Sequence, residues 1–202
     1  QDFVHFQGSF DNLTCWTPVG NCPSELGGLA VLRGSHKVKP VLKHHFSLGA
    51  GSLHVDPSEH GELEDEWYST NYEVGDTLIF PALTIHMALP NVTEDQLRVS
   101  LDNRYQAVDD PIAEHMLEPH LSNFSPFGWE QVYQDWDNEE LKYYWKREPV
   151  KVIPRDFSYS NQGFDEAIEM ARTGNPQARH HLERFVRRVP DSPEGQRAAR
   201  LL

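Results

Sequence analysis

Hydrophobic residues in the first hundred positions fall into short runs that alternate with polar residues, and Gly, Pro, Asn and Asp separate the runs. Runs of this kind, rich in Val, Ile, Thr, Phe, Tyr and Trp, are typical of β-strands. None of them is followed by a helical pattern, which favours an antiparallel sandwich or barrel over βαβ units. The predicted strands span residues 2–7, 12–19, 29–34, 76–82, 84–89 and 97–106.

After Ala107 the hydrophobic period becomes helical. Residues 126–148 carry aromatic side chains at helical spacing, which predicts helices that pack an aromatic stripe onto the sheet. The sequence therefore predicts a mainly β domain over residues 1–107 and a C-terminal α-helical extension over residues 108–202, without a flexible linker. Further helices, with Asn-Pro and Ser-Pro pairs at two of their starts, are predicted within residues 164–175, 175–190 and 192–202.

The segment of residues 52–69 interrupts the β pattern, because it is acidic, contains histidine and has few aliphatic residues. We predict a long surface loop here. A loop of this length in a compact domain is often functional, and it would help to determine the choice of substrate.

The formal net charge of −13 argues against binding nucleic acid or an anionic membrane through a basic surface. No apolar run approaches the length that crosses a bilayer. Cys15 and Cys22 are too few for a disulfide scaffold and fit a reducing, cytoplasmic compartment, although one local disulfide stays open. No signal peptide is visible, and the strand-like residues at the first positions predict further chain upstream of Gln1.

Eleven histidines occur in the chain, and His86 has the most unusual setting. It lies in the apolar run LTIHMAL, where burial of an unpaired imidazole is unfavourable. Strand alternation places Thr84, His86 and Ala88 on one face. Two interpretations follow from these residues: a metal ligand, or a core histidine bonded to a backbone carbonyl. The other histidines considered are His44, His45, His60, His180 and His181, expected at the surface, and His115 and His120, expected to pack near the helical part.

Arg98 and Ser100 share one face of the next predicted strand, while Val99 and Leu101 occupy the other. A guanidinium among residues that favour burial needs an anionic partner, and a carboxylate bound in bidentate fashion is the best match. Ser100 would add a hydroxyl donor to the same carboxylate. Arg104 lies on this face near the end of the strand, where we expect an acidic side chain to pair with it.

Two segments could complete a metal site with His86. His54-Val55-Asp56 is a His-x-Asp sequence that begins 32 residues before His86 (86 − 54), and Asp2 lies 84 residues before it (86 − 2). Non-haem Fe(II) oxygenases use two histidines and one carboxylate on one face of the metal, with open positions for other ligands. The short interval after His54 leaves no room for the strands that separate such ligands in a barrel, which favours Asp2. Its partner histidine would then stand immediately before Gln1.

Five segments also occur in an order that resembles one enzyme family. They are Gln1-Asp2-Phe3, which looks like the end of a His-Gln-Asp motif; the strand segment Leu13–Pro18; the glycine turn and Gly-Ser-His segment Gly27–Lys37; Gly75–Phe80 followed by His86; and Arg98-Val99-Ser100. Through these segments, residues 1 to about 106 resemble the phytanoyl-CoA dioxygenase family of Fe(II)- and 2-oxoglutarate-dependent oxygenases.

The resemblance implies a double-stranded β-helix, also called a jelly roll or cupin-like fold. It implies that Asp2, His86 and one further histidine bind Fe(II). Arg98 would hold the distal carboxylate of the cosubstrate 2-oxoglutarate, with Ser100 and Trp16 beside it. The implied reaction is hydroxylation of an unactivated C–H bond of a small organic molecule by O2, with release of succinate and CO2. Related halogenases have a small residue in place of the carboxylate, so Asp2 favours hydroxylation.

Two other functions are compatible with parts of the pattern. A catalytically inactive jelly-roll binding module would keep the fold, but it has little reason to retain a buried Arg98 beside Ser100. A metal-dependent isomerase or hydrolase of the cupin type typically has more histidines at the metal and does not need Arg98. We therefore predict an enzyme with a small-molecule substrate and with neither nucleic acid nor membrane as a partner; substrate identity and oligomeric state do not follow from the sequence.

Overall fold

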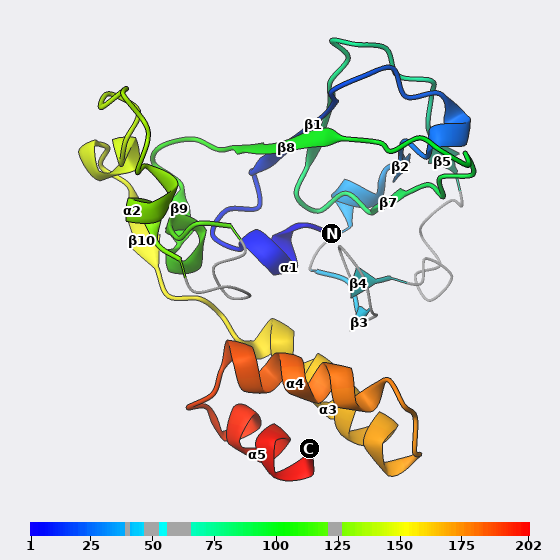
Figure 1. The fold of residues 1–202 in the computed structure, drawn as a ribbon, viewed down its shortest axis with the longest axis vertical. Coiled ribbons are helices and arrows are strands. Elements are labelled where there is room, and N and C mark those ends of the chain that lie inside the picture. The colour runs from blue at the N-terminus through cyan, green and yellow to red at the C-terminus, as the bar shows by residue number, and fades with distance from the viewer. Residues whose placement is uncertain (39–40, 47–52, 56–65, 121–126) are drawn as a thin grey trace. The chain divides into compact units, whose positions relative to one another are not determined.

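The computed structural model describes residues 1–38, 41–46, 53–55, 66–120 and 127–202. The chain divides into two compact units, each with its own hydrophobic core (Figure 1). The first unit comprises Gln1–Lys43 and Val55–Ile112, and the second comprises His44–His54 and Ala113–Leu202. The predicted boundary after Ala107, between the β domain and a helical extension packed on it, stays a prediction.

A three-stranded antiparallel sheet in the first unit has the order β6-β1-β8. Its strands are β1 (Leu13–Pro18), β6 (Leu78–Pro81) and β8 (Ser100–Tyr105). Thr14, Trp16 and Pro18 are buried and the residues between them are more exposed, so alternate side chains of β1 face the interior. The register places Thr14 opposite Arg104 and Trp16 opposite Asp102, which puts these β8 side chains on the same inward face.

A second three-stranded antiparallel sheet in this unit has the order β5-β2-β7. Its strands are β2 (Leu29–Leu32), β5 (Trp67–Tyr68) and β7 (His86–Ala88), and the short turns η1 (Ser24–Leu26) and η2 (Ser35–Lys37) flank β2. Gly27, which follows η1, has a φ of +78°, and a Cβ at this position would lie 2.4 Å from the Leu89 carbonyl oxygen. The turn therefore requires glycine, and it brings the Gly28 carbonyl within 2.9 Å of the Leu89 amide that donates to it.

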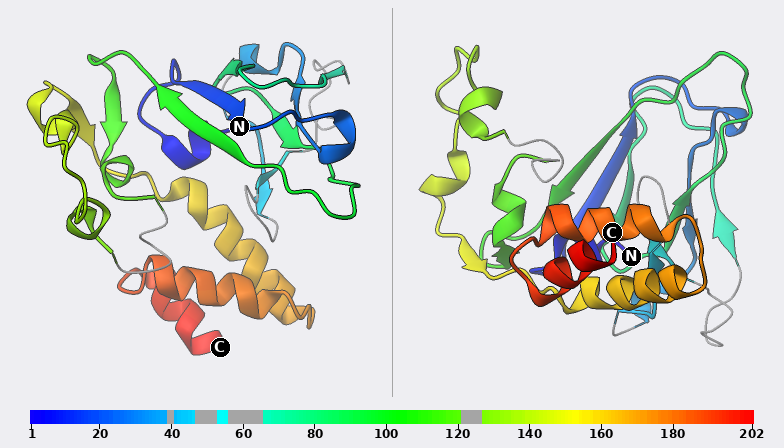
Figure 2. Two further views of the ribbon diagram at one scale, coloured as in Figure 1. Left: turned by 45° about the horizontal axis from the view of Figure 1, so that its top comes forward. Right: turned by 60° about the horizontal axis from the view of Figure 1, so that its bottom comes forward.

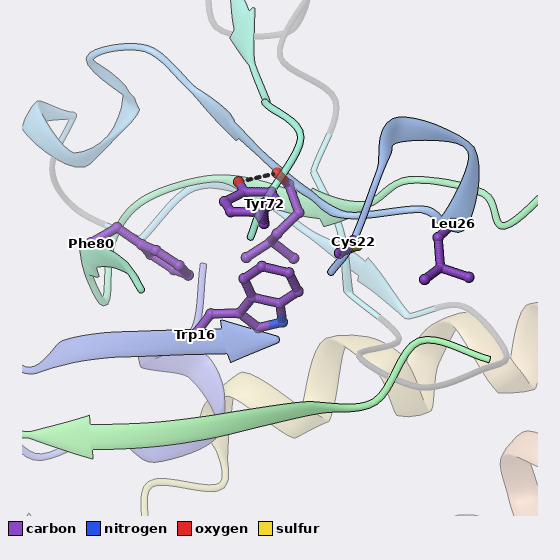
Figure 3. Close-up of a cluster of buried hydrophobic side chains, with 6 residues drawn as sticks. Trp16, Cys22, Leu26, Tyr72 and Phe80 are labelled. Carbon is purple, nitrogen blue, oxygen red and sulfur yellow. Dashed lines mark hydrogen bonds between the residues drawn. The ribbon is translucent and has the colours of Figure 1, made fainter. Parts of the chain in front are cut away.

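The core of the first unit is built around Trp16, which is only 3% exposed. Figure 3 shows its indole below Tyr72, with the ring centroids 4.9 Å apart, and near Phe80. The Tyr72 hydroxyl donates to a backbone carbonyl at 2.8 Å, so this buried phenol is satisfied. Cys22 belongs to the same cluster, and its thiol is free like that of Cys15, so the local disulfide that the sequence left open is not formed.

The predicted strand at residues 2–7 is wrong, because this segment forms α1 (Phe3–Phe6), a single helical turn. The Asp2 carbonyl begins the turn by accepting from the amides of His5 and Phe6, at 2.8 and 3.1 Å. One turn is too short for a helical period to be visible in the sequence. The remaining predicted strands correspond to β1, β2, β6, β7 and β8, so the antiparallel β architecture is confirmed at this level.

The described part of the second unit is formed by short strands, several helical turns and three longer helices. Its elements are β3 (His45–Phe46), β4 (Leu53–His54), η4 (Glu114–Leu117), α2 (Trp129–Val132), η5 (Tyr144–Arg147), β10 (Lys151–Ile153), α3 (Ser158–Arg172), α4 (Ala178–Arg188) and α5 (Pro193–Leu201), and the division between the units falls within β9 (Pro111–Ala113). The predicted loop of residues 52–69 contains β4 and β5, and its residues 56–65 lie outside the described part of the chain.

Helices α3, α4 and α5 lie side by side in both Figure 1 and Figure 2. They bury Phe164, Ile168 and Leu182 in a common core. The Ser192 hydroxyl accepts from the Gly195 amide at 2.9 Å, which confirms the predicted start of the last helix. No helix in the described ranges is long and apolar enough to cross a membrane.

The long helices with an aromatic stripe predicted over residues 126–148 do not form in the described part, residues 127–148, where only α2 and η5 are helical. The aromatic rings pack on one another instead: Trp129 stacks on Tyr133 with centroids 5.2 Å apart and lies 4.9 Å from Trp145. The acidic run between them forms turns, in which the Asn138 side chain accepts from the amide two residues later at 2.9 Å. Such local side-chain bonds compete with helix formation.

Two of the histidines expected at the surface are buried: His44 is 5% exposed and His181 is 4% exposed. The His44 Nε2 atom lies 3.5 Å from the Tyr159 carbonyl oxygen. Burial, followed by the charge of Arg184, lowers the pKa of His181. A periodic pattern of polar residues could not show these positions, because histidine is common on both surfaces and interiors. His60 lies outside the described residues.

Candidate metal centre

Asp2 and His86, which are 84 residues apart in the chain (86 − 2), meet in the first unit, where Asp2 Oδ1 lies 3.3 Å from His86 Nε2. Backbone and side-chain bonds fix the start of the chain at this place. The Phe3 amide donates to the Ala82 carbonyl at 3.1 Å, and the Gln1 side-chain amide donates to the Leu83 carbonyl at 2.9 Å. These bonds hold α1 against the turn that leads into β7, and so they bring the carboxylate to the imidazole.

The His86 ring is oriented by its own strand. Its Nδ1 lies 3.0 Å from the Thr84 carbonyl oxygen, and because a carbonyl can only accept, Nδ1 carries the proton. Burial lowers the pKa of His86 and outweighs the opposing effect of the Asp2 charge, so the ring is neutral at physiological pH. Its Nε2 lone pair is then directed toward Asp2.

The Asp2 carboxylate divides its two oxygens between different partners. Its Oδ2 accepts from the Thr14 hydroxyl at 2.7 Å and from Arg104 Nη2 at 3.0 Å, while Oδ1 faces His86. Burial alone would raise the pKa of Asp2, but attraction to a protonated His86, the charge of Arg104 and the Thr14 hydrogen bond together lower it. Asp2 is therefore an ionised carboxylate with one oxygen saturated by donors.

These two atoms form a donor set that suits a metal ion. A carboxylate oxygen and an unprotonated imidazole nitrogen are both electron-pair donors, and facing each other they need a cation between them. With bonds of about 2.1 Å at right angles, two neighbouring ligand atoms lie about 3 Å apart, close to the observed separation. No group of three or more His, Cys, Asp or Glu side chains in the described parts of the chain is placed to hold a metal. The pair thus supplies part of a ligand set, and its binding of iron stays a prediction.

Arg98, predicted to lie on a strand, comes just before β8 begins at Ser100. Pairing still continues past the strand, since the Val19 amide donates to the Val99 carbonyl at 2.9 Å. Arg98 Nη1 donates to Ser100 Oγ at 2.8 Å, and the guanidinium carbon lies 5.4 Å from the centre of the Trp16 ring. The guanidinium is half-buried, and among the described residues it forms no ion pair.

Arg104 has the acidic partner that we expected for it. Its guanidinium pairs with Asp102 on the same strand and with Asp2, and it lies over the Phe6 ring at 4.2 Å. Arg104 therefore belongs to the Asp2 end of the inward face, and Arg98 belongs to the other end. The Trp16–Asp102 pair lies between them in the register.

The sequence interpretation missed Thr14, which is 1% exposed and whose hydroxyl bonds directly to Asp2. The available signal was its position on β1, two residues before Trp16 and therefore on the same inward face. For the alternative metal ligands, His54 is exposed on β4 in the second unit, and Asp56 lies outside the described residues.

Comparisons with known proteins point to one family. Residues 1–100 match the family model described as phytanoyl-CoA dioxygenase (PhyH). Two relatives from Streptomyces arenae and Streptomyces exfoliatus are both named 1-deoxypentalenic acid 11-beta-hydroxylase; they are 36% identical over 112 residues and 32% identical over 111 residues. Each alignment covers 52% of this chain and 39% of the relative, so the chain spans well under half the length of these curated relatives.

Solved structures show a weaker likeness. The crystal structure of the epimerase SnoN in complex with Fe3+, alpha ketoglutarate and nogalamycin RO has 24% sequence identity and a TM-score of 0.44, and the match covers 54% of this chain and 41% of that chain. A likeness at this level adds no argument about the site.

Proposed function

Residues 1–100 belong to the phytanoyl-CoA dioxygenase family, and from this premise we propose that the chain carries part of the active site of an Fe(II)- and 2-oxoglutarate-dependent dioxygenase that hydroxylates an unactivated C–H bond. The observation that carries the proposal is the Asp2–His86 pair, with Oδ1 and Nε2 3.3 Å apart. The family match and the named hydroxylase relatives support the same reaction class. The two sheets, β6-β1-β8 and β5-β2-β7, would be the two halves of a double-stranded β-helix.

In this proposal Asp2 Oδ1 and His86 Nε2 hold the iron. The family pattern expects one more ligand, a histidine immediately before Gln1. The bound iron supplies the oxidative chemistry, in which O2 and 2-oxoglutarate are consumed and succinate and CO2 are released. Asp2 is buried and the His86 side chain is 20% exposed, which would limit the access of bulk water, and the bond from His86 Nδ1 to the Thr84 carbonyl keeps Nε2 available.

Arg98 would bind the distal carboxylate of 2-oxoglutarate. This half-buried guanidinium lies beside a hydroxyl and has no anionic partner among the described residues, which matches a planar carboxylate that accepts several hydrogen bonds. Trp16 would position the guanidinium through a cation–π contact, because its indole ring is itself fixed in the core. The elongated cosubstrate would then lie along the inward face, with its keto-acid end toward Asp2 and His86.

The substrate would be a small organic molecule, as the names of the hydroxylase relatives suggest. Asp2 favours hydroxylation over halogenation, because a halogenase of this family leaves the carboxylate position to a halide. The inactive binding module of the same fold is the outcome to be tested against this proposal.

The deciding experiment is 2-oxoglutarate turnover by the full-length protein. We expect succinate to form only when Fe(II) and O2 are both present, and a chelator to stop its formation. Succinate formed without iron would overturn the proposal. Tight binding of iron and 2-oxoglutarate with no succinate under any condition would instead establish a binding module.

A further inference from the structure

The Asp2 carboxylate has an asymmetry that the binding of iron does not by itself require. Its Oδ2 accepts two hydrogen bonds, from the Thr14 hydroxyl at 2.7 Å and from Arg104 at 3.0 Å. Its Oδ1 accepts no bond from either of them and faces His86 Nε2. Thr14 is 1% exposed and stands opposite Arg104 in the β1–β8 register, so the two donors approach Oδ2 from neighbouring strands.

We infer that Thr14 and Arg104 are positioning residues that make Asp2 a one-oxygen ligand and thereby keep a metal coordination position free for 2-oxoglutarate. A carboxylate can bind a metal through one oxygen or through both, and the second mode occupies one more position. Since the cosubstrate needs open positions beside the protein ligands, a carboxylate that bound through both oxygens would compete with it. The inference rests on the proposed function and deepens it.

Arg104 is itself held in place. Asp102 pairs with its other side, and the Phe6 ring lies 4.2 Å from its guanidinium carbon. These contacts hold the guanidinium beside Asp2 and keep it from turning toward solvent. Its positive charge beside the metal site also opposes cation binding, which is a cost that a residue serving only to strengthen metal affinity would not carry.

That opposing charge gives the inference a distinctive signature. In Arg104→Met the charge is lost and Oδ2 keeps only the neutral Thr14 donor, so the affinity for Co(II), used as an air-stable probe, should stay the same or rise. At the same time the affinity of the Co(II)-loaded protein for 2-oxoglutarate should fall by about 10- to 100-fold. Thr14→Val should act in the same direction on 2-oxoglutarate affinity with a smaller effect, because the charged Arg104 donor still engages Oδ2. The double variant should show the largest change.

The experiment measures Co(II) binding, the absorption spectrum of bound Co(II) and 2-oxoglutarate binding to the Co(II)-loaded full-length protein. Conservative variants test positioning directly: Arg104→Lys and Thr14→Ser retain a donor and should recover most of the 2-oxoglutarate affinity. Matched controls are Thr17→Val, which removes an exposed hydroxyl from the same strand, and Arg33→Met, which removes an arginine paired with Glu66. Both controls should leave the spectrum and both affinities unchanged.

The outcomes separate this inference from the proposed function. If wild-type protein takes up Co(II) and 2-oxoglutarate, and the Thr14 and Arg104 variants keep its spectrum and affinities, only the inference fails. A parallel loss of both affinities with a lowered unfolding temperature assigns the two residues a purely structural role and also overturns it. If wild-type protein binds no metal, the proposed function fails and the inference falls with it.

Discussion

Arg98 and Arg104 lie six residues apart (104 − 98) and direct their guanidinium groups to the same inward face, but their surroundings differ at every contact. Arg104 pairs with Asp2 and Asp102, while Arg98 has a hydroxyl and an aromatic ring. The charge of Arg104 is therefore already paired with protein carboxylates and needs no ligand. The end at Arg98 has a cation for which the described residues supply no anion.

The difference shows how one residue type serves two purposes on one sheet. A guanidinium surrounded by internal carboxylates fixes protein groups in place, here the Asp2 oxygen that a metal would not use. A guanidinium supported only by neutral groups keeps its charge available for an external carboxylate. The inward face is therefore polarised along its length, from a metal-binding end at Asp2 and His86 to an anion-binding end at Arg98.

The largest effect should come from the metal-binding end. His86→Ala removes a ligand, so we expect iron affinity to fall by more than about a hundredfold, beyond the loss typical of groups outside the ligand set. Succinate production should fall to background. Anaerobic titration with Fe(II) measures the affinity, and His180→Ala, at an exposed histidine of the second unit, is the control. Iron loss in His54→Ala and Asp56→Ala would instead show that Asp2 was the wrong choice.

Arg98→Met should weaken the binding of 2-oxoglutarate without affecting the binding of iron. Loss of charge-assisted hydrogen bonds worth about 1.5–3 kcal/mol predicts a rise of about 10- to 150-fold in the 2-oxoglutarate concentration needed for half-maximal turnover. Iron affinity should not change, because no described contact joins Arg98 to Asp2 or His86. In Arg98→Lys the 2-oxoglutarate requirement should lie between those of the wild type and Arg98→Met, because lysine keeps the charge and loses the planar fork. An equal loss of iron affinity in Arg98→Met would contradict the division of the face into two ends.

Ser100→Ala should give a smaller change of the same kind. Its hydroxyl is a neutral partner, whose hydrogen bond contributes about 0.5–1.5 kcal/mol, so the 2-oxoglutarate requirement should rise by about 2- to 10-fold. Steady-state kinetics at saturating iron measure it. Ser24→Ala, which removes an exposed hydroxyl that bonds to Asn71, should leave the requirement unchanged.

Trp16→Phe should have the smallest effect on cosubstrate binding. A smaller ring weakens the cation–π contact with Arg98 by about 0.5–1 kcal/mol, which corresponds to about a 2- to 5-fold higher 2-oxoglutarate requirement. Leu26→Ala provides the comparison, because Leu26 lies in the same core cluster. It should lower the free energy of unfolding by about 2–5 kcal/mol in denaturant titrations without changing the 2-oxoglutarate requirement. A similar kinetic effect in both variants would mean that Trp16 acts only through stability.

Local patterns predicted much of the first unit. Alternation in a run such as NLTCWTPV is visible because a strand with one buried face repeats every two residues, and β1 has that burial pattern. The turn at α1 was missed for the opposite reason, since Phe3 and Val4 are both buried and one turn has no period to detect. The aromatic spacing in residues 126–148 was real, but the rings pack on one another across turns.

The site residues also separate into those that the sequence predicted and those that only the structure shows. Residue chemistry and spacing alone selected Asp2, His86 and Arg98 as candidates and gave Arg104 an acidic partner. Only the tertiary structure shows that His86 presents Nε2, because the tautomer depends on the Thr84 carbonyl. It also decides that Arg104 and Thr14 share one oxygen of Asp2.

The sequence by itself therefore determined which residues could bind a metal and a carboxylate, since those capacities belong to the side chains. The tertiary structure decided which atom of each side chain is free and which is already bonded. That choice depends on strand register and on contacts such as Asp2 with Arg104, which are 102 residues apart. No local pattern encodes a register between distant strands, because it is set by the packing of the whole unit.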